Sequence, residues 1–105
     1  MLHTVEVRRR RVRVDPAAAV AGTSGADEVA LDLDAEWEEL DVRVALSRGE
    51  DRWEAAWVGE PVPIPDGALE VPGVWLEVSV VGEAPGRRLA TSECRRGIWV
   101  ARGGA

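Results

Sequence analysis

The stretch EVALDLDAEWEELDVRVAL, residues 28 to 46, decides the fold class of this chain. Its apolar residues recur at every second position on both sides of an acidic centre: Val29, Leu31 and Leu33 before it, and Leu40, Val42, Val44 and Leu46 after it. A period of two is typical of β-strands that bury one face. The stretch therefore predicts the end of one strand, a corner filled by Trp37, and the start of a second strand.

The acidic centre DLDAEWEELD, residues 32 to 41, places six carboxylates around one tryptophan and invites comparison with a calcium loop. Asp32, Asp34 and Glu36 have the 1-3-5 spacing of such a loop. Position 6 is Trp37, where the sharp turn needs glycine, and position 12 is Arg43, where a glutamate belongs. We expect no metal here, and instead solvent-facing aspartates at a strand end, with one helical turn capped by Asp34 as the alternative.

The same alternation predicts strands outside this stretch. The opening HTVEVRRRRVRV is interpreted as one strand, bent near Arg9 and Arg10, because its valines change parity there. Further strands are expected at residues 18–21, 53–57, 74–81, 87–91 and 97–101, with turns at 47–52, 71–73 and 82–87. The proline-rich segment 61–65 is expected to cross the fold in extended form, anchored by Val62 and Ile64.

These patterns predict an all-β chain. About seven or eight short strands without an amphipathic helix favour an antiparallel β-sandwich, with a small β-barrel as the alternative. A chain of 105 residues has the size of one domain. We expect the domain to span residues 1–101 and a flexible C-terminal tail to span 102–105.

Composition restricts the function. The net charge is −6, although residues 1–14 hold five arginines against one glutamate. An acidic body disfavours nucleic acid, and the arginine-rich strand lacks interleaved aromatic residues on which bases could stack. No apolar run is long enough to span a bilayer, so we expect no membrane insertion and no signal peptide. The single cysteine, Cys94, fits folding in a reducing cytosol.

Catalytic chemistry is poorly supported by the sequence. His3 is the only histidine and has no obvious partner near the start of the chain. Arg95 and Arg96 are placed to lower the pKa of Cys94, but a lone cysteine is more often a packing residue. We expect no enzyme, no catalytic residue and no cofactor.

Two sets of residues are candidates for partner binding instead. Arg8, Arg9 and Arg10 are expected to pair with the domain's own acids or with a neighbouring subunit. Trp75 lies on the opposite parity from the apolar residues of its strand, so its ring is expected either on the surface or against a second apolar layer. On the surface, Trp75 would be an anchor for a partner, and Trp53 is the second candidate anchor. Trp37, Trp57 and Trp99 are expected to fill the sandwich.

Several short motifs carry a family resemblance: EWEEL (36–40), VPIP (62–65), PGVWLEVSVVG (72–82), RLAT (88–91) and IWV (98–100). Their order is similar to that of the small Ig-like β-sandwich domains of tailed-bacteriophage baseplate, tail-fibre and related virion proteins. The matched positions are core and turn residues across nearly the whole chain, and none carries a chemical function.

The resemblance implies a phage or prophage virion structural protein that is made in the bacterial host cytoplasm. It would act by docking to other virion subunits, at the tail, baseplate or capsid, as a homo- or hetero-oligomer. The alternative function is a carbohydrate- or host-surface-binding module, with Trp53 or Trp75 as the platform for a glycan.

Overall fold

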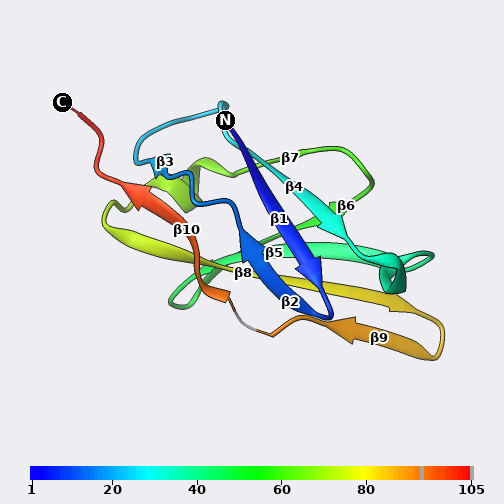
Figure 1. The fold of residues 1–105 in the computed structure, drawn as a ribbon. Coiled ribbons are helices and arrows are strands. Elements are labelled where there is room, and N and C mark those ends of the chain that lie inside the picture. Colours follow the sequence, from blue (N-terminus) through cyan, green and yellow to red (C-terminus); the bar gives the residue numbers. More distant parts are fainter. Residues whose placement is uncertain (93, 105) are drawn as a thin grey trace.

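A computed structural model of the chain describes residues 1–92 and 94–104 as two packed β-sheets (Figure 1). The strands are β1 Leu2–Arg8, β2 Arg11–Val14, β3 Ala19–Val20, β4 Glu28–Leu33, β5 Asp41–Arg48, β6 Asp51–Trp57, β7 Val62–Pro63, β8 Val74–Ala84, β9 Arg87–Ala90 and β10 Cys94–Ala101. The helical elements are two short 3₁₀ turns, η1 Ala35–Trp37 and η2 Asp66–Leu69. The prediction of an all-β sandwich is confirmed.

The sheets are mixed rather than purely antiparallel. One sheet has the order β2-β1-β4-β7, and the other has the order β3-β10-β8-β5-β6, with β9 paired to β8. The β1–β4 and β10–β3 pairs are parallel, which corrects the expectation of an antiparallel sandwich. Parallel neighbours need a crossover, and here the chain makes each crossover by visiting the other sheet.

Ten strands replace the expected seven or eight for two physical reasons. The first expected strand is divided into β1 and β2, and the proline-rich segment contributes the two-residue β7 at the edge of its sheet. An edge is where proline, which cannot donate to a ladder, is tolerated.

The division of the first strand is a tight hairpin and not a bend. Val5 pairs with Val14 and Val7 with Val12, which leaves Arg9 and Arg10 as a two-residue loop. Both loop residues have positive φ, 52° and 62°, as a type I′ turn requires. Residues that face each other across a hairpin lie on the same side of the sheet. The valines of β1 and β2 therefore share one face, although those of β1 have odd numbers and those of β2 have even numbers.

The core lies between the inner faces of the sheets and follows the predicted alternation. Leu76, Val78 and Val80 of β8 are fully buried, as are Ile98 and Val100 of β10. Ile64 is buried and Val62 is half-buried, so the segment before η2 is anchored as expected.

The corner between β4 and β5 also matches its prediction. Trp37 ends η1 and is 2% exposed, so its ring closes one end of the sandwich. A Cβ atom on Gly82 of β8 would lie 3.0 Å from Trp37 Cε3 and 3.0 Å from Leu40 Cδ1. A larger residue at position 82 would therefore have to displace one of these two side chains by a few tenths of an ångström.

The β5–β6 hairpin, the turn at Gly73 and the β8–β9 hairpin lie where the sequence predicted turns. The chain after β10 has no regular structure from Arg102 to Gly104. The last residue of the predicted tail, Ala105, lies outside the described residues.

Candidate binding surfaces

The arginines of the β1–β2 hairpin contact the acidic corner that follows β4. Arg8 donates from Nη2 to Asp32 Oδ2 at 2.9 Å and from Nη1 to the Asp32 carbonyl at 2.9 Å. Arg10 contacts both carboxylate oxygens of Glu36, at 3.1 and 3.3 Å. The expectation that these arginines pair with the domain's own acids is confirmed for Arg8 and Arg10.

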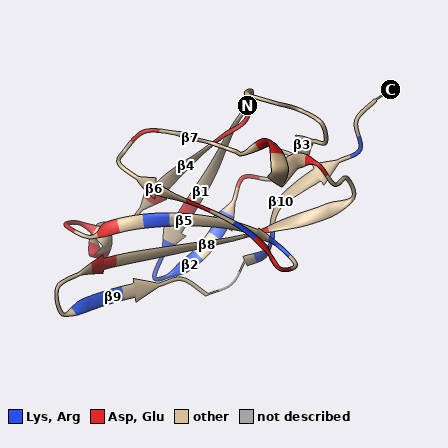
Figure 2. Cartoon of the chain, turned by 180° about the vertical axis from the view of Figure 1, so that it is seen from behind, with Lys and Arg blue, Asp and Glu red and all other residues tan. Residues whose placement is uncertain are grey.

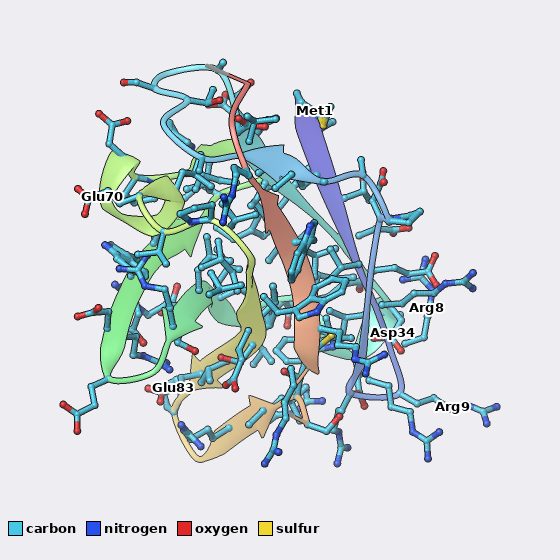
Figure 3. All side chains as sticks on the ribbon, turned by 90° about the vertical axis from the view of Figure 1, so that its left-hand side faces the viewer. Met1, Arg8, Arg9, Asp34, Glu70 and Glu83 are labelled. Atoms are coloured by element: carbon cyan, nitrogen blue, oxygen red, sulfur yellow. The ribbon has the colours of Figure 1, made fainter. Side chains whose placement is uncertain are left out.

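Arg9 is attached through its backbone. Its N–H donates to Asp34 Oδ2 at 2.9 Å. Asp34 occupies the N-cap position of η1 but makes no side-chain cap, and its Oδ1 is buried without a hydrogen-bond partner among the described residues. Figure 3 shows Arg8, Arg9 and Asp34 together at one corner of the molecule, with Arg9 directed outward. Exposed ion pairs contribute about 0–1 kcal/mol each, so this corner positions the hairpin more than it stabilises the fold.

Trp75 is exposed on the outer face of the larger sheet. It lies directly opposite Trp99 in the β8–β10 ladder, with ring centroids 5.1 Å apart and planes inclined by 57°. Ala101 follows Trp99 on the same face, and Val20 of β3 pairs with Ala101. Their sequence neighbours Leu76, Val100 and Ala19 are buried on the inner face, which fixes the orientation.

We call Val20, Trp75, Trp99 and Ala101 the tryptophan face. Trp75 is 42% and Val20 43% exposed, and Trp99 is half-buried beside them. Of the two placements expected for Trp75, the structure shows the exposed one. The prediction that Trp99 fills the sandwich is wrong, because its register with Trp75 turns its ring outward.

Trp53 lies on the inner face and is not an exposed anchor. It pairs with Leu46 in the β5–β6 ladder, is half-buried, and lies 5.3 Å from the Arg48 guanidinium carbon. The backbone of Gly67 packs against its indole. Trp57, two positions after Ala55 on the same strand, is also half-buried against the core.

His3 has a buried partner that the sequence analysis missed. Its Nε2 lies 2.8 Å from Asp27 Oδ1, His3 is 0% exposed, and the Asp27 side chain is almost as fully buried. The parallel β1–β4 register brings together two residues that are 24 positions apart. One signal was available: His3 shares the parity of Val5 and Val7, which marks it as a residue of the buried face.

This pair is incomplete as a catalytic arrangement. His3 Nδ1 is buried and has no hydrogen-bond partner among the described residues. With the ring fully enclosed, no substrate could reach it, so we assign the pair to the stability of the β1–β4 edge.

Cys94 is a packing residue. Burial raises the pKa of its thiol above the ordinary value, opposed by a hydrogen bond from the Arg96 backbone. The less favoured alternative, that the neighbouring arginines lower this pKa, does not hold, because desolvation dominates. Within residues 1–92 and 94–104 no group of acidic, histidine and cysteine side chains is arranged to hold a metal ion.

Charge is distributed unevenly over the strands. Figure 2 shows arginines on β2 and β9 and acidic residues at the β4–β5 corner and on β8. On β6, Arg52 donates to Glu54 Oε1 at 2.7 Å, and this contact lowers the pKa of Glu54.

Comparison of the chain with protein-family models, curated protein sequences and solved structures finds no match. No helix in the described part of the chain has the length and apolarity needed to cross a membrane.

Proposed function

We propose that this protein is a structural binding module that docks onto another protein through the tryptophan face. The observation that carries the proposal is the exposed indole of Trp75, which packs against Trp99 on the sheet face that also exposes Val20. Apolar side chains that gather into one exposed patch mark interaction sites, whereas single scattered ones do not. Tryptophan is also the residue type most enriched among those that dominate binding energy.

The geometry supports docking more than catalysis. Trp75 lies within β8 and pairs with Trp99 of β10, so it is presented to a partner without a loop that must be ordered first. A rigid anchor loses little conformational entropy on binding. Around it, the described residues offer no cleft with convergent acid, base or nucleophile.

We further propose that the partner is a protein of a phage or prophage virion. The support for this step is the order of core and turn motifs in the sequence, together with an all-β sandwich in which those motifs occupy core and turn positions. The protein would then be a tail, baseplate or capsid-associated component assembled in the host cytoplasm.

The docking proposal is tested with substitutions on the tryptophan face. Trp75→Arg is expected to reduce incorporation into particles, measured by mass spectrometry of gradient-purified virions, by at least about tenfold. Trp75→Phe should retain most of it. Val58→Arg is the matched control, because Val58 is 78% exposed but follows β6, away from this face.

Absence of the chain from purified particles, together with neighbouring genes that encode no portal, capsid or tail protein, would refute the virion assignment. Equal incorporation of Trp75→Arg and Val58→Arg would refute the assignment of the face.

Glycan binding is the second candidate, because the same exposed ring could stack on a sugar. A glycan array separates the two functions. Binding to a defined sugar that is lost in Trp75→Ala would favour the carbohydrate module, and no binding to any sugar would favour protein docking.

A further inference from the structure

The long free edge of the larger sheet is formed by β6. Within the described residues, β6 pairs with β5 alone and ends the strand order of its sheet. In Figure 3 the green β5–β6 hairpin lies at the side of the molecule opposite the blue β1–β2 hairpin. An unpaired edge strand offers its backbone groups to another strand.

The other edge strands are shorter than β6. The end strands β3 and β7 have two residues each, β7 follows Pro61 and contains Pro63, and the edge strands β2 and β9 have four residues each. By contrast β6 has seven residues, DRWEAAW, with neither proline nor glycine. Its inward-facing residues Trp53, Ala55 and Trp57 are apolar, and Asp51, which has the same parity at the start of the strand, is paired with Arg48 at 3.4 Å, so the middle of the edge carries no inward charge.

The hairpin geometry defines which backbone groups are free. Arg48 and Asp51 flank the two-residue β5–β6 loop and therefore form a hydrogen-bonded pair. Hydrogen bonding to β5 then alternates along β6. The N–H and C=O groups of Arg52, Glu54 and Ala56 consequently point away from β5, toward the free edge.

The side chains along this edge are self-complementary. Arg52 and Glu54 lie two residues apart on the same outer face, opposite Ser47 and Ala45 of β5. If a second β6 runs antiparallel across a two-fold axis through Trp53, Arg52 lies opposite Glu54 of the second copy, and Glu54 lies opposite its Arg52. Trp53 then faces Trp53 of the second copy on the inner side.

We propose that β6 is a self-association edge, on which a second copy of this chain adds its own β6 in antiparallel register, with Arg52 opposite Glu54 of the second copy. Each Arg52–Glu54 pairing is both a backbone hydrogen-bonded pair and a cross-strand ion pair. The two-fold arrangement closes after two copies and joins the two larger sheets into one. This edge is separate from the tryptophan face, so the inference does not depend on the proposed function.

The experiment is a pair of charge reversals studied by sedimentation velocity over a wide range of protein concentration. The wild-type chain is expected to shift from monomer to dimer as its concentration rises. Arg52→Glu alone, or Glu54→Arg alone, should weaken dimerisation by about tenfold or more, since each places like charges opposite each other at two symmetric positions.

An equimolar mixture of the Arg52→Glu and Glu54→Arg variants should dimerise again. In the mixed dimer, one copy presents two carboxylates along β6 and the other presents two guanidinium groups, so opposite charges face each other at both positions. Arg88→Glu is the matched control: it breaks a similarly exposed ion pair, Arg88 to Glu83 at 3.0 Å on β9 and β8, and makes the same change in net charge as Arg52→Glu. It should dimerise like the wild type.

Glu54→Pro tests the backbone contribution without reversing a charge, because it removes an outward N–H that makes no bond within the sheet. It should be monomeric and folded, as judged by its thermal unfolding. A wild-type chain that stays monomeric at every concentration, equal weakening by Arg52→Glu and Arg88→Glu, or a mixture that stays monomeric would overturn the proposal.

Discussion

Replacing Asp27 with alanine tests whether the buried His3–Asp27 contact stabilises the fold. His3 is 0% and Asp27 7% exposed, so the substitution removes the partner of Nε2 in the interior of the protein. His3 Nδ1 already lacks a partner, and the ring would then have no hydrogen bond among the described residues. Leaving a buried polar group unsatisfied costs about 1–3 kcal/mol. We therefore expect a loss of that size in the free energy of unfolding.

The measurement is urea unfolding followed by tryptophan fluorescence, for which the chain has five reporters. A thermal scan should show a fall in Tm of about 4–8 °C for each kcal/mol lost, by the usual scaling for small domains. Asp27→Asn should lose less, because its amide oxygen still accepts one hydrogen bond from the imidazole.

Ser24→Ala is the matched control. It removes an exposed side-chain contact, Ser24 to Asp66 at 2.9 Å, and should change stability by less than about 0.5 kcal/mol. If Asp27→Ala were no more destabilised than Ser24→Ala, the contact would be energetically neutral and our account of the β1–β4 edge would be wrong.

Three further outcomes follow from the structure. Replacing Arg9-Arg10 with Asn-Gly should raise the free energy of unfolding by about 1 kcal/mol, because positive φ is unfavourable for arginine and the lost Arg10–Glu36 ion pair is exposed. A lower free energy of unfolding in a urea titration would contradict this prediction. Gly97→Ala should destabilise by more than about 2 kcal/mol, since its Cβ would lie 2.4 Å from the Leu76 carbonyl oxygen, whereas Gly104→Ala, with nothing within 4 Å, should be neutral in the same assay. Cys94 should react slowly with iodoacetamide at neutral pH, because its raised pKa keeps the thiol protonated, and the alkylation rate should rise steeply only above the ordinary thiol pKa. Fast alkylation at neutral pH would show that the thiol is not buried.

Local patterns were sufficient to predict the strands and most of the turns. The alternation in residues 28–46 determined the β4–corner–β5 unit, including the burial of Trp37, because one buried face imposes a period of two on any strand. Glycines that tolerate positive φ also predicted where most of the turns lie, because a turn depends on the conformation of only a few neighbouring residues. These properties depend only on neighbours in sequence.

Register between distant strands could not be predicted in this way. The parallel β1–β4 pairing brings His3 to Asp27, and the β8–β10 register turns Trp99 outward beside Trp75, yet nothing local distinguishes these registers from others. The Arg9-Arg10 turn was missed for a different reason. A type I′ turn normally contains asparagine or glycine, and here the Asp34 bond to the Arg9 backbone helps to hold two arginines in that conformation.

The route of the chain between the two sheets has a consequence for folding. It passes from β1 and β2 to β3 in the other sheet, returns for β4, leaves again for β5 and β6, and returns once more for β7 before β8 to β10 complete the structure. The smaller sheet therefore uses residues from 2 to 63 and the larger one residues from 19 to 101, so the strands of the two sheets are interleaved along the chain. We expect a single cooperative transition with slow refolding, because so many pairings join distant segments. Cutting the chain between β6 and β7 should leave no fragment with a complete sheet of its own.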